Sequence, residues 1–204
     1  MLFKKTVNSR LLELLKELMS YSYFKEFNLV EGTSLALQIG HRESIDIDLF
    51  GKKELEETEI SEVLSSLGKV QILKKSKNIL VYSVDGIKVD FVNYRYPWLR
   101  APKIYENLRL AHMSDIGAMK LNAISGRGSK KDFIDLFFLL KEFQFSDLME
   151  FYNKKYGDGS TFLVLKSLTY FEDADLEESP RMIINTSWEE VKSTIVSEVK
   201  QYLN

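Results

Sequence analysis

The segment IDIDLF, which begins at Ile45, alternates between apolar and acidic side chains. A period of two predicts a β-strand, because successive side chains of a strand point to opposite faces. We expect Ile45, Ile47 and Leu49 to pack against the core and Asp46 and Asp48 to project together from the other face. Two like charges side by side bring the fold no benefit. Either a bound cation explains them, or they lie solvated on an exposed edge strand.

A third carboxylate lies in the middle of another predicted strand, Ile87–Asn93. There Asp90 points away from its neighbours Val89 and Phe91. If the two strands are adjacent, three acids converge and raise one another's pKa unless a cation neutralises them. Oxygen ligands in this number suit Mg²⁺, and a pair of such ions can stabilise the attacking and leaving oxygens at phosphorus. We therefore expect Asp46, Asp48 and Asp90 to hold Mg²⁺, as two ions.

The chain has 204 residues and no cysteine. This composition excludes disulfides, thiolate metal sites and cysteine nucleophiles, and it suits a reducing compartment. No apolar stretch near the N-terminus is typical of a signal peptide. The longest strongly apolar run, residues 136–140, is too short to cross a bilayer. We expect a soluble cytoplasmic protein that has no membrane partner.

The net charge of −2 excludes a globally basic nucleic-acid binder. Contact with RNA would depend on local basic patches, and a solvated surface is the alternative explanation of each patch. The candidates are two clusters: Lys74, Lys75 and Lys77; and Arg127, Lys130 and Lys131.

Apolar spacing and turn signals predict an α+β fold. We expect a small mixed β-sheet core with flanking helices in residues 1–100 and a mainly helical region in residues 101–204, with ligand bound between them. Asp85-Gly86 indicates a tight hairpin. Strands are predicted at 27–30, 45–50, 69–73, 79–84 and 87–93. Helices are predicted at 7–20, 33–39, 54–67, 114–125 and 130–143, from Ser146, around 162–171 and from Ser187.

Gly32, Thr33 and Ser34 lie between a predicted strand and a predicted helix. Unpaired backbone N–H groups and the positive end of a helix make such a turn a phosphate site, and the hydroxyls add donors. The plainer interpretation is a simple N-cap. The sequence contains no GxxxxGK[ST], so the chain is not a P-loop NTPase.

The combination of this turn with Asp-x-Asp and a later third aspartate resembles the DNA polymerase β-like nucleotidyltransferase superfamily. Within it, EGTSLAL…HRESIDIDLF is similar to the AbiEii-type nucleotidyltransferases, whose pattern is close to GGTAL…R-x-S-x-D-x-D. Glu31 departs from that pattern, because the family usually has its first glycine there. It places a negative charge near the expected triphosphate. The residues that fall on the pattern are Gly32, Thr33, Arg42, Ser44, Asp46 and Asp48.

The segment DIGAMKLNAISGRGSKKDFIDLFFLL resembles a second block of that family, K-x-x-A-x-x-x-R-x-x-x-[RK]-D-x-x-D. Its matching residues are Lys120, Ala123, Arg127, Lys131, Asp132 and Asp135. Lys120 and Arg127 are seven residues apart on one predicted helix, hence on one face, from which both can reach a triphosphate. Plainer interpretations stay open: Lys120 as a surface lysine, Asp132 as a helix start with Ser129, and Asp135 as an orienting partner of a basic residue.

The resemblance implies metal-dependent transfer of a nucleotide from an NTP to an acceptor hydroxyl. Asp46 and Asp48 would hold Mg²⁺, and Asp90 would bind a second ion or accept the proton of the hydroxyl. The turn at Gly32 would bind the β- and γ-phosphates. Members of the family act as toxins of toxin–antitoxin or phage-defence systems, some on tRNA 3′ ends. The resemblance thus implies a tRNA acceptor and a cognate antitoxin.

Two other functions remain open from the sequence. One is nucleotidylation of a small molecule or of a protein hydroxyl, as in antibiotic-modifying relatives of the superfamily. The other is a non-catalytic partner-binding domain of the same fold, against which the intact set of three aspartates speaks. A basic acceptor groove would favour RNA, and failure to bind Mg²⁺–NTP would favour the non-catalytic domain.

Overall fold

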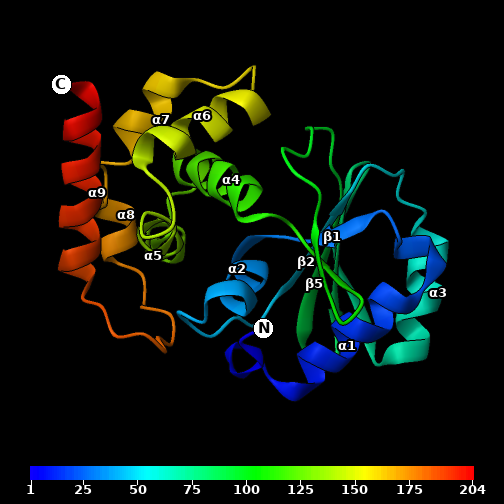
Figure 1. The fold of residues 1–204 in the computed structure, drawn as a ribbon. Coiled ribbons are helices and arrows are strands. Elements are labelled where there is room, and N and C mark those ends of the chain that lie inside the picture. Colours follow the sequence, from blue (N-terminus) through cyan, green and yellow to red (C-terminus); the bar gives the residue numbers. More distant parts are fainter. The chain divides into compact units, whose positions relative to one another are not determined.

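A seven-stranded mixed sheet organises the first half of the chain in the computed structural model, which describes residues 1–204 (Figure 1). The strand order is β3-β4-β5-β2-β1-β7-β6. The pairs β2–β5 and β1–β7 are parallel and the others are antiparallel. The strands are β1 Phe27–Leu29, β2 Ile47–Gly51, β3 Val70–Ser76, β4 Ile79–Val84, β5 Ile87–Asn93, β6 Lys103–Tyr105 and β7 Leu108–Leu110.

Helices accompany the sheet and dominate the second half of the chain, which confirms the expected α+β class. Two short 3₁₀ segments, η1 and η2, lie near the N-terminus. The helical segments are η1 Lys4–Thr6, α1 Ser9–Ser20, η2 Ser22–Phe24, α2 Glu31–Ile39, α3 Glu57–Leu67, α4 Met113–Gly126, α5 Lys130–Leu139, α6 Phe145–Lys155, α7 Thr161–Ser167, α8 Glu172–Asp175 and α9 Trp188–Leu203.

The chain divides into two compact units. The first comprises Met1–Arg95 and Pro102–Ala111, and the second comprises Tyr96–Ala101 and His112–Asn204. The chain therefore passes between the units three times. The hairpin of β6 and β7, which the sequence pattern did not reveal, completes the sheet of the first unit.

Helices α1 and α3 cover one face of the sheet in the first unit (Figure 1). Helical spacing brings four leucines of α1 to one fully buried face, Leu11, Leu14, Leu15 and Leu18, whereas Leu12 is only partly buried. Ile47 and Leu49 of β2 are also fully buried, but Ile45 is 69% exposed. Our expectation for Ile45 was wrong because β2 begins only at Ile47, so the alternation of a strand does not yet apply at Ile45.

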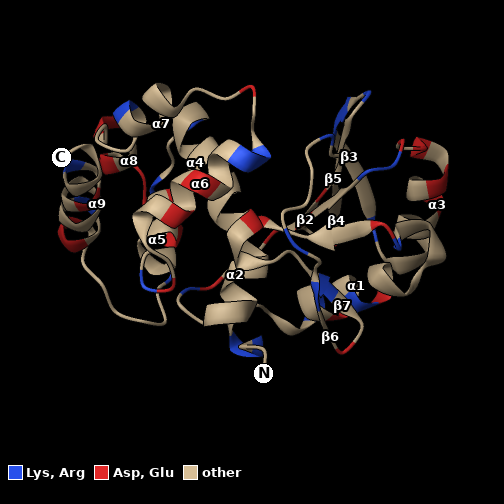
Figure 2. Cartoon of the chain, turned by 45° about the horizontal axis from the view of Figure 1, so that its top comes forward, with Lys and Arg blue, Asp and Glu red and all other residues tan.

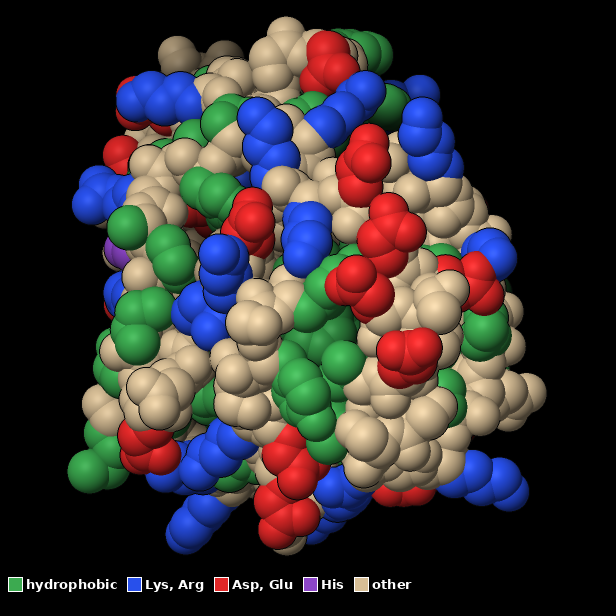
Figure 3. Space-filling view, turned by 90° about the vertical axis from the view of Figure 1, so that its right-hand side faces the viewer, with side chains coloured by type: hydrophobic (Ala, Val, Ile, Leu, Met, Phe, Trp, Pro, Cys, Tyr) green, Lys and Arg blue, Asp and Glu red, His purple; other side chains and the backbone are tan.

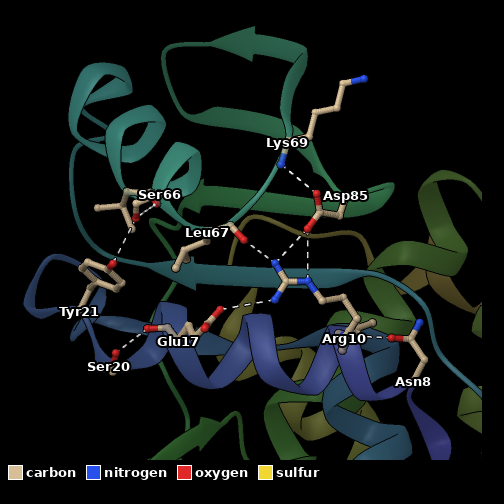
Figure 4. Close-up of polar contacts among 11 residues, drawn as sticks. Asn8, Arg10, Glu17, Ser20, Tyr21, Ser66, Leu67, Lys69 and Asp85 are labelled. Atoms are coloured by element: carbon tan, nitrogen blue, oxygen red, sulfur yellow. Dashed lines mark hydrogen bonds and ion pairs between the residues drawn. The ribbon is translucent and has the colours of Figure 1, made fainter.

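A tight hairpin joins β4 to β5 at Asp85 and Gly86, as expected, with φ of 50° and 84°. The carboxylate of Asp85 accepts the backbone N–H of Lys69 at 2.8 Å and an Nη2–H of Arg10 at 2.9 Å (Figure 4). Arg10 also donates to the carbonyl oxygen of Leu67. These bonds tie α1 to the end of α3 and to the hairpin, and they hold the pKa of Asp85 below its usual range.

Helix caps explain where two helices of the second unit begin. Ser187 accepts the N–H of Glu190 and starts α9, as predicted. Helix α4 begins at Met113, one residue before the predicted start at Ser114. His112 is the N-cap, and its Nδ1 accepts the N–H of Ser114 at 3.2 Å. Both caps satisfy amides that the first turn of a helix leaves without a partner.

A buried ion pair anchors the segment Tyr96–Ala101 within the second unit. The Nζ of Lys155 lies 2.7 Å from Oδ1 of Asp115, and both side chains are fully buried. Asp115 also accepts the backbone N–H groups of Leu99 and Arg100. The connecting segment is thereby fastened to α4 and α6 by charge-assisted hydrogen bonds.

Candidate active site

Asp48 and Asp90 are paired across the parallel strands β2 and β5. Neighbouring strands lie about 4.8 Å apart, so their side chains project side by side from one face. The opposite face carries Ile47 and Val89, both fully buried in the core. Asp46 lies just before β2, two residues ahead of Asp48. The structure thus places Asp48 and Asp90 on two adjoining strands, with Asp46 in the segment that leads into β2.

The electrostatic environment of Asp48 is unfavourable for a carboxylate. Burial, together with the negative charges of Glu31, Asp90 and Asp46, raises its pKa from 3.8 to about 7, and the positive charge of Lys88 opposes this rise. A carboxylate that is hard to ionise in a field of like charge is stabilised by a cation. The environment of Asp48 is therefore suited to a positively charged ligand.

Asp90 uses only one of its two carboxylate oxygens. Its Oδ2 accepts a hydrogen bond from Nζ of Lys88 at 2.7 Å. Its Oδ1 is buried and has no hydrogen-bond partner. A buried oxygen without a partner is costly, and in native proteins such an atom marks a place for an ion or a water. Sequence reasoning missed Lys88, although its spacing of two residues from Asp90 on one strand face was the available signal.

The oxygen atoms of this cluster are of the chemical type that binds divalent cations. Carboxylate oxygens are the ligands that Mg²⁺ prefers, and Oδ1 of Asp90 lacks a partner. As the side chains stand, no group of three or more His, Cys, Asp or Glu residues lies close enough together to hold a metal ion. The cluster therefore supplies ligands of the right type but does not bring three of them together.

Helix α2 begins directly beside the acidic strand. Its N-cap Val30 donates its N–H to the carbonyl of Asp48 at 2.9 Å. Because the first amides of a helix lack partners within the helix, the start of α2 offers N–H donors next to the carboxylates. Gly32 lies within the first turn of α2 and not in a loop before it.

The hydroxyl of Thr33 is directed inward, which differs from the expectation that it adds a phosphate donor. It lies 2.7 Å from Oγ of Ser44 and also bonds to the carbonyl of Asp46, and the residue is fully buried. Ser34 is likewise fully buried, with Nε2 of Gln38 lying 3.3 Å from its Oγ. Thr33 thereby holds α2 against the segment before β2, whereas Ser34 bonds within α2, which leaves the backbone of the first turn as the available donor.

Glu31 has a φ of 56°, in the left-handed region. That conformation is easy for glycine and unfavourable for other residues. Its charge is the largest electrostatic influence on Asp48 apart from burial. The departure from a glycine at this position therefore alters both the backbone and the charge beside the acids.

The second unit contains a buried cluster of charges around Asp132. Nζ of Lys120 lies 2.9 Å from Oδ1 of Asp132 and 2.9 Å from Oδ2 of Asp135. Arg127 donates its Nε–H to Oδ2 of Asp132 at 2.8 Å, and the Ser129 hydroxyl donates to the same oxygen at 2.7 Å. Four residues of the second sequence block thus lie in one network, together with Ser129.

This network determines which of its groups reach the surface. The side chains of Lys120, Asp132 and Asp135 are at most 1% exposed, whereas that of Arg127 is 56% exposed. Burial opposes the ionisation of Asp132, but the charges of Lys120 and Arg127 outweigh it and hold the pKa of Asp132 well below its usual range. Arg127 follows the last residue of α4 as its C-cap, so only Lys120 belongs to the helix proper.

The two expected basic patches differ in how many of their side chains already have partners within the protein. Lys74 and Lys77 are exposed at the β3–β4 hairpin, where Figure 2 shows basic residues gathered, and Lys75 pairs with Glu57. In the other cluster, Lys130 bonds through its side chain to the carbonyl of Glu177. On the face drawn in Figure 3, basic and acidic side chains are interspersed and form no broad field of one sign.

The mixed sheet carries Asp48 on β2, Asp46 just before it and Asp90 on the parallel neighbour β5, the arrangement that the resemblance to nucleotidyltransferases predicts. The family described as "Nucleotidyl transferase AbiEii toxin, Type IV TA system" matches residues 13–201. The chain belongs to this family of toxin nucleotidyltransferases.

Individual proteins are also similar to this chain. The chain is 39% identical over 197 residues to aq_aa25, an uncharacterized protein of Aquifex aeolicus (strain VF5), covering 94% of this chain and 95% of the relative. Its fold is similar to that of JHP933 from Helicobacter pylori, with a TM-score of 0.61, 18% identity and coverage of 94% and 88%. It is also similar to MenT4, nucleotidyltransferase toxin Rv2826c from Mycobacterium tuberculosis H37Rv, with a TM-score of 0.54, 14% identity and coverage of 95% and 86%.

No helix of this chain combines the length and the apolar character that crossing a membrane requires.

Proposed function

We propose that this chain transfers a nucleoside monophosphate from an NTP to an acceptor hydroxyl of tRNA and releases pyrophosphate. The observation that carries the proposal is the pairing of Asp48 with Asp90 on parallel strands, in a chain of the AbiEii family. The cluster lies beside the first turn of α2, whose amides suit phosphate.

Asp46 and Asp48 are proposed to hold Mg²⁺, with Asp90 as a ligand of a second ion or as the acceptor of the hydroxyl proton. Bound Mg²⁺ would neutralise phosphate charge and stabilise the oxygens that attack and leave phosphorus. The unpartnered Oδ1 of Asp90 supports either role for that residue. The raised pKa of Asp48 supports cation binding, because a cation would restore its charged form.

The turn at Gly32, Thr33 and Ser34 is proposed to bind the β- and γ-phosphates through the backbone amides of Gly32 and Thr33, because the amide of Ser34 donates to the carbonyl of Val30. In the second unit, Lys120 and Arg127 are proposed to offset the negative charge that develops as pyrophosphate leaves. Arg127 is the better suited to direct contact, since its guanidinium is largely exposed. Asp132 and Asp135 would then act as counter-ions that hold Lys120 in place.

The proposed acceptor, partner and location follow from the toxin family. A tRNA would bring phosphates to which the exposed Lys74 and Lys77 can bind. A cognate antitoxin would restrain the activity, and defence against phage is the proposed setting. The absence of cysteine suits the cytoplasm, where NTP and tRNA are both present.

The test is an incubation of the purified chain with Mg²⁺, each labelled NTP in turn and total tRNA, beside an Asp46→Asn variant. Label that enters tRNA only with the native chain supports the proposal and identifies the base. Pyrophosphate release with cell extract but no labelled RNA would point to a small-molecule or protein hydroxyl. Neither signal, with no binding of Mg²⁺–NTP by calorimetry, would point to a non-catalytic partner-binding domain.

A further inference from the structure

Lys88 lies within the acidic cluster, and none of the roles proposed above involves it. It precedes Asp90 by two residues on β5, so both side chains project from the same face. Its Nζ lies 2.7 Å from Oδ2 of Asp90, and its side chain is 43% exposed. The ammonium therefore has both a firm partner and access to solvent.

The register of the sheet gives Lys88 a second acidic neighbour. Asp48 pairs with Asp90 and Ile47 pairs with Val89. Continued by one residue, the same register sets Lys88 opposite Asp46. Four residues thus form an array on this face, with a lysine at one corner and aspartates at the other three: Lys88, Asp46, Asp48 and Asp90.

We propose that Lys88 is a positioning residue that acts as a tethered cation: it neutralises the aspartates while no metal is bound and weakens the binding of a divalent ion to them. This inference rests on the proposed metal site. The hydrogen bond to Oδ2 removes one of the two oxygens of Asp90 from the set that a metal can use. The remaining oxygen, Oδ1, is the one left without a partner.

Simple electrostatics gives the size of the effect. A unit charge about 6 Å from a divalent ion repels it, even in water, by an energy equal to a factor of about ten in affinity. A neutral residue at position 88 removes that repulsion and frees Oδ2 of Asp90. The array then carries three acids with no built-in cation, which favours binding of a metal.

Binding of Mn²⁺ to the full chain, followed by loss of the EPR signal of free Mn²⁺, tests this directly. The variants are Lys88→Met, which keeps the length of the side chain, and Lys88→Arg, which keeps its charge. Lys69→Met is the matched control, an exposed lysine ahead of β3. We expect about tenfold tighter binding by Lys88→Met, and native affinity for Lys88→Arg and Lys69→Met.

Two outcomes would overturn the inference, and they differ in what else they affect. If Lys88→Met binds Mn²⁺ as the native chain does, or more weakly, the tethered-cation role is wrong while the metal site stands. If neither the native chain nor Lys88→Met binds Mn²⁺, with circular dichroism showing both folded, the metal site itself fails and the inference fails with it.

Discussion

Asp48 and Asp90 occupy paired positions on parallel strands, with their carboxylates on the face opposite the core. The arrangement carries a cost for the fold, because like charges next to each other in a partly buried place repel. The hydrophobic core beneath offsets this cost through Ile47, Leu49, Val89 and Phe91, all fully buried. The fold thus tolerates a pair of carboxylates that does not stabilise it, as expected of a site that binds a positively charged ligand.

Asp48→Asn should stabilise the metal-free chain, increasingly so as the pH rises. The pKa of Asp48 is about 7 in the folded chain against 3.8 as its ordinary value. The folded state therefore binds more protons than the unfolded state between these values, and stability falls as pH rises through that window. The gain should approach a few kcal/mol, at about 1.4 kcal/mol per unit of pKa shift as an upper bound.

Urea unfolding with EDTA at pH 5 and pH 8 measures this difference. The native chain should lose stability between the two values relative to Asp48→Asn. An equal pH dependence of the two proteins would show that Asp48 ionises normally.

Asp46→Asn should abolish transfer without unfolding the chain. Asp46 lies before β2 and is partly exposed, so the substitution leaves the core intact. If it holds a metal that stabilises the transition state, activity should fall by at least about 100-fold, as for loss of one strong electrostatic contact. The exposed Asp173→Asn is the matched control and should retain native rates of nucleotide incorporation. Near-native activity of Asp46→Asn would remove this residue from the site.

Arg127→Met and Lys120→Met should separate function from stability. Lys120 is buried between two carboxylates, so its loss leaves charge without compensation and should cost about 3–5 kcal/mol. Arg127 is largely exposed, and Asp132 keeps Lys120 and Ser129 as partners without it. We expect Arg127→Met to unfold at nearly the same urea concentration as the native chain. Its transfer activity should fall by about tenfold or more. A stable and fully active Arg127→Met would assign that residue to structure alone.

Much of this site could be predicted because strand periodicity is local. The placement of Asp48 and Asp90 on the face away from the core follows from alternation alone, and the hairpin at Asp85 follows from turn chemistry. The pairing of β2 with β5 is a long-range contact that no local pattern specifies. From the sequence, the three acids were expected to converge only if these two strands were adjacent. The same holds for Lys88, whose role depends on which strand lies beside it.

The burial of Lys120 could not be predicted from its helix. An isolated lysine on a helix is usually solvated, and burial requires compensating carboxylates. Those come from α5, at Asp132 and Asp135, and only the packing of α5 against α4 brings them close. Thr33 shows the same limit, because its inward bond to Ser44 depends on how the chain returns to β2.

Glu31→Gly should improve nucleotide binding. Glycine adopts the left-handed backbone at φ 56° without strain. It also removes the negative charge that raises the pKa of Asp48 the most. We expect a several-fold lower KM for NTP, with Glu31→Gln giving the part of the effect that charge alone accounts for. Steady-state kinetics over a range of NTP at saturating Mg²⁺ measures both variants. A raised KM in Glu31→Gln would instead make this carboxylate part of the binding site.

Lys74 and Lys77 should contribute to RNA affinity through phosphate contacts. Each lysine that neutralises a phosphate of a single strand releases about 0.7 counter-ion, which appears as the slope of log affinity against log salt. A Lys74→Ala, Lys77→Ala double variant should therefore lower that slope by about 1.4 and weaken tRNA binding most at low salt. Fluorescence anisotropy with labelled tRNA from low to high KCl measures the slope. Lys5→Ala, Lys25→Ala is the matched control, since both lysines are exposed and lie outside the hairpin. If the hairpin variant keeps the native slope while the chain still labels tRNA, the acceptor binds elsewhere and these lysines serve only as a solvated edge of the sheet.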